Sequence, residues 1–189
     1  IGGALNRPLV TGKDSVAAAI ASKHFSTATP ENDLKWQLVH PRPNEYNWEQ
    51  ADSFVAFCEK IKIVPIGHCL VWHGQVPRWV YLDDAGNALT RDALLSRMKD
   101  HILTVVGRYK GKIKAWDVVN EAIADGGDEV LRNSLWRQII GPDFIAKAFE
   151  YAHEADPDAI LRYNDYGLEN PAKRQKLIKL IKSLQEQKV

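Results

Sequence analysis

Short apolar runs alternate along the chain with segments of helical periodicity. The runs are strand-like in length and cover residues 1–6, 25–29, 63–71, 113–120 and 159–164. Apolar residues recur at helical spacing over residues 15–22, 52–60, 94–105, 144–155 and from Pro171 onward. Thr90 can cap the third of these helices, and Pro171 suits the first turn of the last. The pattern therefore predicts a strand followed by a helix, five times over.

This alternation predicts a parallel sheet, which can be an open doubly wound sheet or a closed barrel. No G-x-G-x-x-G stretch follows the first predicted strand, which argues against the dinucleotide-binding form of the open sheet. We expect a TIM (β/α)8 barrel that is incomplete here, with about five of its eight units present. Eight such units need roughly 300 residues. The expectation is that residues 1–189 are the N-terminal part of a single (β/α)8 catalytic domain.

Polar residues cluster where the predicted strands end. In a barrel, the loops that follow the strands meet at one mouth, so we expect these side chains to converge. They are Glu31, Asn32, His68, His73, Asn120, Glu121, Asn164 and Asp165.

Composition and charge argue against several classes of function. The chain has 25 basic and 24 acidic residues, a net charge of +1, which argues against nucleic acid or an anionic membrane as partner. No apolar run is long enough to span a membrane, and no signal peptide is recognisable at residue 1. We expect Cys58 and Cys69 to be buried free thiols rather than a disulfide. On the last helix, Leu177, Ile178, Ile181 and Leu184 are expected to share an apolar face.

The fourth predicted strand ends in Asn120-Glu121. Cleavage of a glycosidic bond needs a carboxylic acid that protonates the leaving oxygen. It also benefits from a hydrogen bond to the sugar 2-hydroxyl, which an amide such as Asn120 can supply. An Asn-Glu pair on its own is common, however, and Glu121 could equally pair with a lysine or cap a helix.

Two further segments carry polar groups that could read sugar hydroxyls. The stretch 29–36, Thr-Pro-Glu-Asn-Asp-Leu-Lys-Trp, follows the second strand. The stretch 67–77 sets His68, Trp72, His73 and Gln75 at the end of the third. A spacing of five between the two histidines is not typical of a zinc ligand pair, so no metal site is predicted.

These three segments, together with Tyr163-Asn164-Asp165-Tyr166, resemble the family 10 glycoside hydrolases in order and spacing over essentially the whole chain. The resemblance implies a retaining endo-β-1,4-xylanase that cleaves xylan by double displacement without a cofactor. Glu121 would be its general acid/base. The implied substrate-binding residues are Glu31, Asn32, Lys35, His68, Trp72, Gln75, Asn120 and, on the leaving-group side, Tyr166, while His73 and Asp117 would orient them.

One part of the family pattern has no counterpart in the chain. The family nucleophile is a second glutamate in an Ile-Thr-Glu-Leu-Asp-like stretch on the seventh strand, and no such stretch occurs among the 189 residues. We therefore expect the chain to act with a missing C-terminal barrel segment, in the same protein or as a separate piece. A non-catalytic xylan-binding fragment and another retaining β-1,4-glycanase remain the alternatives. Because xylan is too large to enter a cell, a secreted or cell-envelope location is expected.

Overall fold

The computed structural model describes residues 1–187 and contains one parallel sheet. Its strands follow chain order across the sheet, each pairing with the next. They are β1 (Gly2–Leu5), β2 (Thr27–Pro30), β3 (Val64–Val71), β4 (Ala115–Asn120) and β5 (Ile160–Asn164). The five predicted strands are thus confirmed, with ends that differ from the expected ones by no more than two residues.

All five predicted helices are present. They are α2 (Ser15–His24), α4 (Glu49–Ile61), α5 (Arg91–Arg108), α7 (Phe144–Ala155) and α8 (Pro171–Glu186). The Thr90 hydroxyl caps α5 by accepting a hydrogen bond from the Ala93 amide at 3.3 Å. The sequence pattern did not predict the single-turn elements, because one turn is too short to show a period: α1 (Arg7–Val10), α3 (Trp36–Val39), the 3₁₀ turn η1 (Arg78–Val80) and α6 (Leu135–Ile139).

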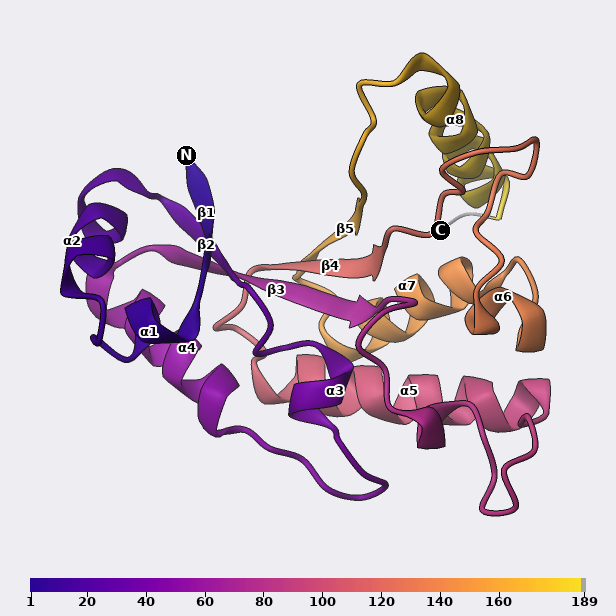
Figure 1. Ribbon diagram of the computed structural model, residues 1–189, viewed down its shortest axis with the longest axis horizontal. Helices are drawn as coiled ribbons and strands as arrows, with labels where there is room; N and C mark the ends of the chain where they lie inside the picture. The colour runs from indigo at the N-terminus through magenta and orange to yellow at the C-terminus, as the bar shows by residue number, and fades with distance from the viewer. Residues whose placement is uncertain (188–189) are drawn as a thin grey trace.

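Helices α4, α5 and α7 cover one face of the sheet (Figure 1). The core lies between them and the strands, where Phe54, Met98 and Ile145 are wholly buried. Cys58 and Cys69 are buried and free, as expected. On the opposite face, residues from all five strands line one hollow of about 470 Å³. The sheet is therefore curved, as a segment of a barrel wall would be.

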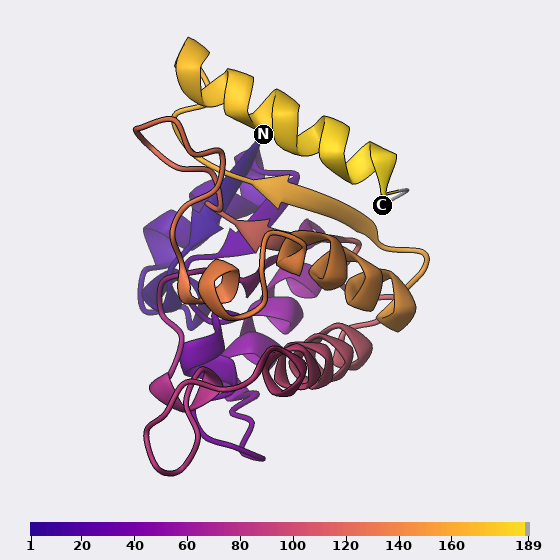
Figure 2. The same cartoon turned by 90° about the vertical axis from the view of Figure 1, so that its right-hand side faces the viewer.

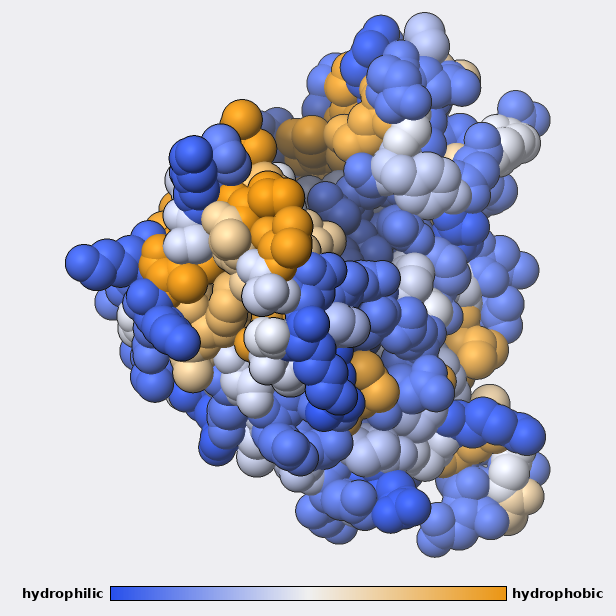
Figure 3. Space-filling view, turned by 60° about the vertical axis from the view of Figure 1, so that its left-hand side comes forward, coloured by the Kyte–Doolittle hydropathy of each residue, from blue (hydrophilic) through white to orange (hydrophobic). Residues whose placement is uncertain are grey.

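The two outermost strands lie at open edges. Within residues 1–187, β1 pairs only with β2, and β5 pairs only with β4. Large apolar side chains stay exposed at both ends of the sheet, among them Ile1 and Ile160 (89% and 63% exposed). Figure 3 shows apolar side chains gathered on the surface at the β1 end. Such edges are typical of a sheet that continues into further strands.

Helix α8 is only partly covered by the rest of the chain. It lies beyond β5, at the edge of the sheet (Figure 2). Leu180 and Lys173 are its buried residues, whereas Ile178 and Ile181 are exposed. The four predicted positions still fall on one side of the helix by their spacing, so within residues 1–187 the expected apolar face is present but only partly covered.

Two buried histidines should make the stability of the fold depend on pH. His40 and His101 share a hydrogen bond between their Nδ1 atoms, 3.1 Å apart, and the His101 ring stacks on Trp36 with centroids 3.7 Å apart. Burial lowers the pKa of His40 from 6.5 to about 4 and that of His101 well below 6.5. Both imidazoles are therefore neutral in the folded protein at pH 7.

The folded-state pKa lies below the unfolded value, so the unfolded chain takes up protons first as the pH falls. We expect the free energy of unfolding to drop by about 3 kcal/mol from His40 alone between pH 7 and pH 4. Urea unfolding at a series of pH values measures this. A His40→Phe/His101→Phe double variant should show a flatter dependence, and substitution of the exposed His153 by glutamine should not. Equal slopes in the wild type and the double variant would contradict the prediction.

Candidate active site

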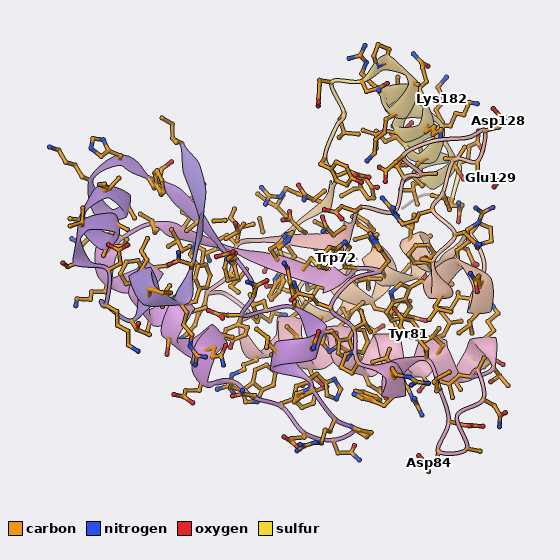
Figure 4. All side chains as sticks on the ribbon, in the orientation of Figure 1. Trp72, Tyr81, Asp84, Asp128, Glu129 and Lys182 are labelled. Carbon is orange, nitrogen blue, oxygen red and sulfur yellow. The ribbon has the colours of Figure 1, made fainter. Side chains whose placement is uncertain are left out.

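Glu121 stands at the carboxyl end of the most deeply buried strand. Every residue of β4 is buried, and Glu121 follows its last residue, Asn120. The neighbouring strand β3 ends at Val71, so Trp72 lies beside Glu121; Figure 4 shows this tryptophan at the tip of β3. The indole Nε1–H of Trp72 donates to Glu121 Oε2 at 2.8 Å. The carboxylate is thus held in a fixed orientation at the end of the sheet.

Trp72 also links Glu121 to a second group of predicted residues, because the indole contacts both. The Lys35 ammonium lies 4.8 Å from the centroid of the Trp72 ring. Lys35 Nζ also donates to Asn32 Oδ1 at 3.0 Å, and Gln75 Nε2 donates to the same oxygen at 3.1 Å. The loops after β2 and β3 therefore place an amide, an ammonium and a second amide beside the indole, where they could bind sugar hydroxyls.

His68 lies inside β3 and not after its end, which corrects the expected position. It still faces the functional side, because its ring lines the hollow on the inner face of the sheet. Its Nδ1 lies 2.9 Å from Asp117 Oδ2. The other carboxylate oxygen of Asp117 accepts two hydrogen bonds from Arg162, at 3.0 and 3.2 Å. Asp117 thus orients His68, as the sequence suggested.

Glu31 lines this hollow, and Asn120 is linked to it through Asn164. Asn120 Oδ1 accepts a hydrogen bond from Asn164 Nδ2 at 2.8 Å, which fixes the direction of the Asn120 amide. Asn164 and Glu31 both line the hollow together with His68. The strand ends of β2, β3, β4 and β5 therefore bring these polar groups together.

Tyr166 and His73 lie at the margin of this arrangement. The Tyr166 hydroxyl donates to Asp125 at 2.6 Å and accepts from Arg132 at 3.3 Å, and half of the residue is exposed (50%). His73 is exposed and meets the Trp72 ring edge to face, with centroids 5.5 Å apart. Partial desolvation of its ring, followed by the nearby Arg132 cation, lowers the pKa of His73. Its expected orienting role rests on the Trp72 contact alone, because it makes no hydrogen bond within residues 1–187.

The sequence pattern did not single out two side chains that contact site residues, Arg162 and Arg132. Arg162 belongs to β5, and the strand alternation of Ile160, Arg162 and Asn164 would have placed it on the inner face. Arg132 Nε donates to the backbone carbonyl of Glu121 at 3.1 Å. Nothing in the pattern around Arg132 indicates this contact, because it depends on how the loop between β4 and α6 folds back.

Across residues 1–187, no group of three or more histidine, cysteine, aspartate or glutamate side chains could hold a metal ion. None of the helices formed by these residues is both long and apolar enough to cross a bilayer. The side chains of the candidate site are a carboxyl group, an indole, amides and an ammonium along one side of an open sheet.

Known proteins are similar to this chain in sequence. Endo-1,4-beta-xylanase A of Xylanibacter ruminicola is 48% identical over 184 residues, which is 97% of this chain and 49% of that protein. A beta-1,4-xylanase of Dictyoglomus thermophilum is 51% identical over 170 residues, or 90% of this chain and 47% of that protein. The chain thus spans about half the length of the curated relatives it matches.

A solved structure has the same fold as this chain. An endoxylanase from a sugarcane soil metagenome superimposes with a TM-score of 0.94 at 46% identity, over 100% of this chain and 54% of that one. The five strand–helix units are therefore part of a TIM barrel. The sequence also matches the model of glycosyl hydrolase family 10 from residue 1 to residue 189. With that match and relatives close to half identical, the chain belongs to glycosyl hydrolase family 10.

Proposed function

We propose that the protein is an endo-β-1,4-xylanase that hydrolyses xylan with retention of configuration, and that Glu121 is its general acid/base. The observation that carries the proposal is the Glu121 carboxylate, held by the Trp72 indole at the carboxyl end of β4 with Asn120 next to it. The names of the relatives support it: the chain is close to half identical to proteins called xylanases. A solved xylanase from Thermotoga petrophila, 42% identical, was crystallised with xylobiose.

The proposed chemistry assigns a task to each side chain. Glu121 protonates the leaving oxygen and later takes a proton from the attacking water. Asn120 donates to the 2-hydroxyl of the sugar, and its amide is already oriented for this by Asn164. His68, fixed by Asp117, would hold the same sugar at the cleavage point.

The remaining polar groups would bind the neighbouring sugars. Glu31, Asn32 and Lys35 supply hydrogen bonds on the glycone side, with Trp72 and Gln75 lining that part of the cleft. Tyr166 would contact the leaving group. The Trp72 indole offers an apolar face for a sugar ring on the side where Lys35 does not cover it.

The nucleophile would come from barrel units outside this chain. A retaining glycosidase needs a second carboxylate about 5–5.5 Å from the first. We infer that the three remaining units, in the same protein or as a separate piece, pair with the open edges of β1 and β5 and deliver it. Because its polymeric substrate stays outside the cell, the protein would be secreted or held at the cell envelope.

The test is hydrolysis of xylohexaose and cellohexaose by the protein with its complete barrel. We expect faster cleavage of xylohexaose, and proton NMR of the first products should show the β-anomer before mutarotation. Preferential cleavage of cellohexaose would point to a glucanase. Early formation of the α-anomer would exclude the retaining mechanism, and binding without hydrolysis would exclude an enzyme.

A further inference from the structure

The backbone that carries Glu121 adopts an unusual conformation. Glu121 has a φ of +54°, in the left-handed region that residues other than glycine, asparagine and aspartate rarely adopt. Such conformations persist only where the surrounding structure holds them, and they gather at functional sites. The direction of the Glu121 side chain therefore depends on whatever holds the turn after β4.

Hydrogen bonds hold this turn from both sides. The Glu121 amide donates to the carbonyl of Asn164 at 2.9 Å, and the Glu121 carbonyl accepts from Arg132. The next two amides, of Ala122 and Ile123, both donate to the hydroxyl of Tyr163, at 2.9 and 3.0 Å, and the Ile123 amide also donates to Asp165 Oδ2 at 3.3 Å. One phenol oxygen thus fixes two consecutive peptide groups directly after Glu121.

The Tyr163 hydroxyl is itself held by a buried ion pair. It donates to Asp165 Oδ2, and Asp165 Oδ1 lies 2.9 Å from Lys173 Nζ. The Asp165 and Lys173 side chains are 0% and 5% exposed, so each charge depends on the other for compensation. Burial, reinforced by the Asp165 carboxylate, raises the pKa of Tyr163, which keeps the phenol protonated and donating to Asp165.

Lys173 extends the network to the loop after β4. Its ammonium also lies 2.8 Å from Asp125 Oδ1, and the other oxygen of Asp125 pairs with Arg132 at 2.8 Å. Lys176, one turn further along α8, donates to two carbonyls of the same loop. Figure 4 shows this loop, with Asp128 and Glu129, lying against α8. Helix α8 therefore holds in place the loop that follows Glu121.

We propose that Tyr163, held in place by Asp165 and Lys173, is a positioning residue that aims the Glu121 carboxyl group at the leaving oxygen. The inference rests on the proposed function, because it assumes that Glu121 is the general acid. Proton transfer needs hydrogen-bond reach between acid and oxygen, and a misplacement of about 1 Å can cost a hundredfold in rate. In this proposal Tyr163 acts on the reaction through the turn that carries Glu121.

The test is Tyr163→Phe in the enzyme with its complete barrel, assayed on two xylobiosides. One carries a poor leaving group and needs protonation, whereas the other carries a dinitrophenyl group and does not. We expect kcat/KM, which reports the glycosylation step, to fall about tenfold or more for the first substrate and by less than about threefold for the second. A purely structural defect would lower both rates by the same factor, through the fraction of folded enzyme.

Two further variants make the result decisive. Tyr151→Phe, on the outer helix α7 and away from Glu121, is the matched control and should leave both rates unchanged. Asp165→Asn keeps an acceptor for the Tyr163 hydroxyl but loses the charge. It should therefore lower the rate on the poor leaving group relative to the dinitrophenyl substrate, as Tyr163→Phe does, but by a smaller factor. If Tyr163→Phe does not fold, Asp165→Asn is the variant that tests the proposal. A ratio equal to that of the wild type in the folded variants would overturn the proposal, whereas a wild type without xylanase activity would overturn the proposed function instead.

Discussion

Replacement of Glu121 by alanine should reduce cleavage of xylan by about 10²–10⁴-fold in the protein with its complete barrel. The loss follows from the missing proton donor, because a sugar leaving group departs poorly as an oxyanion. An activated aryl xyloside should lose far less in the glycosylation step, since its leaving group needs little protonation. Pre-steady-state kinetics on both substrates separates that step from hydrolysis of the intermediate.

Glu154→Ala is the matched control for this experiment. Glu154 lies on α7, where it pairs with Lys99 at the surface, 2.9 Å away, so its loss should leave both rates as they are. Equal losses on the two substrates in the Glu121 variant would argue against an acid/base role. They would point instead to a defect in binding or folding, which KM and thermal unfolding would reveal.

The sequence pattern predicted the fold because the two periods it contains are physically distinct. Buried parallel strands appear as continuous apolar runs, and amphipathic helices as a period near 3.6. The same logic placed Asn120 and Glu121 at the end of β4 and Glu31 after β2, since all the strands run in one direction. For α8 the pattern predicted the helix but not how much of its apolar face is covered, because coverage depends on the elements that pack against it.

Side-chain partners were harder to predict. The bond from Trp72 to Glu121 joins residues 49 positions apart and depends on one indole orientation, which no spacing rule contains. Arg132 and Lys173 were missed for a similar reason: as isolated cations in a polar loop and on a helix, they look like solvated surface. Only the fold reveals that Lys173 is buried between Asp125 and Asp165.

The 189-residue chain tested by itself should be inactive on xylan. Apart from Glu121, the carboxylates at the strand ends are Glu31 and Asp165. The Asp165 side chain is wholly buried and paired with Lys173, so it cannot attack a sugar, and Glu31 matches no nucleophile in the family pattern. The open edges of β1 and β5 should also make the chain poorly soluble or dimeric, because unpaired strand edges and exposed apolar side chains favour association.

Adding a polypeptide with the three remaining strand–helix units should restore activity, provided that the two pieces assemble. Release of reducing sugar measures the activity, and light scattering measures the assembly. A swapped dimer of this chain is the less favoured alternative, because two sets of five strands give ten and the barrel needs eight. Xylan hydrolysis by the purified monomer would contradict the prediction. Since Asp165 is engaged by Lys173, that result would leave Glu31 as the carboxylate that takes the nucleophile's place.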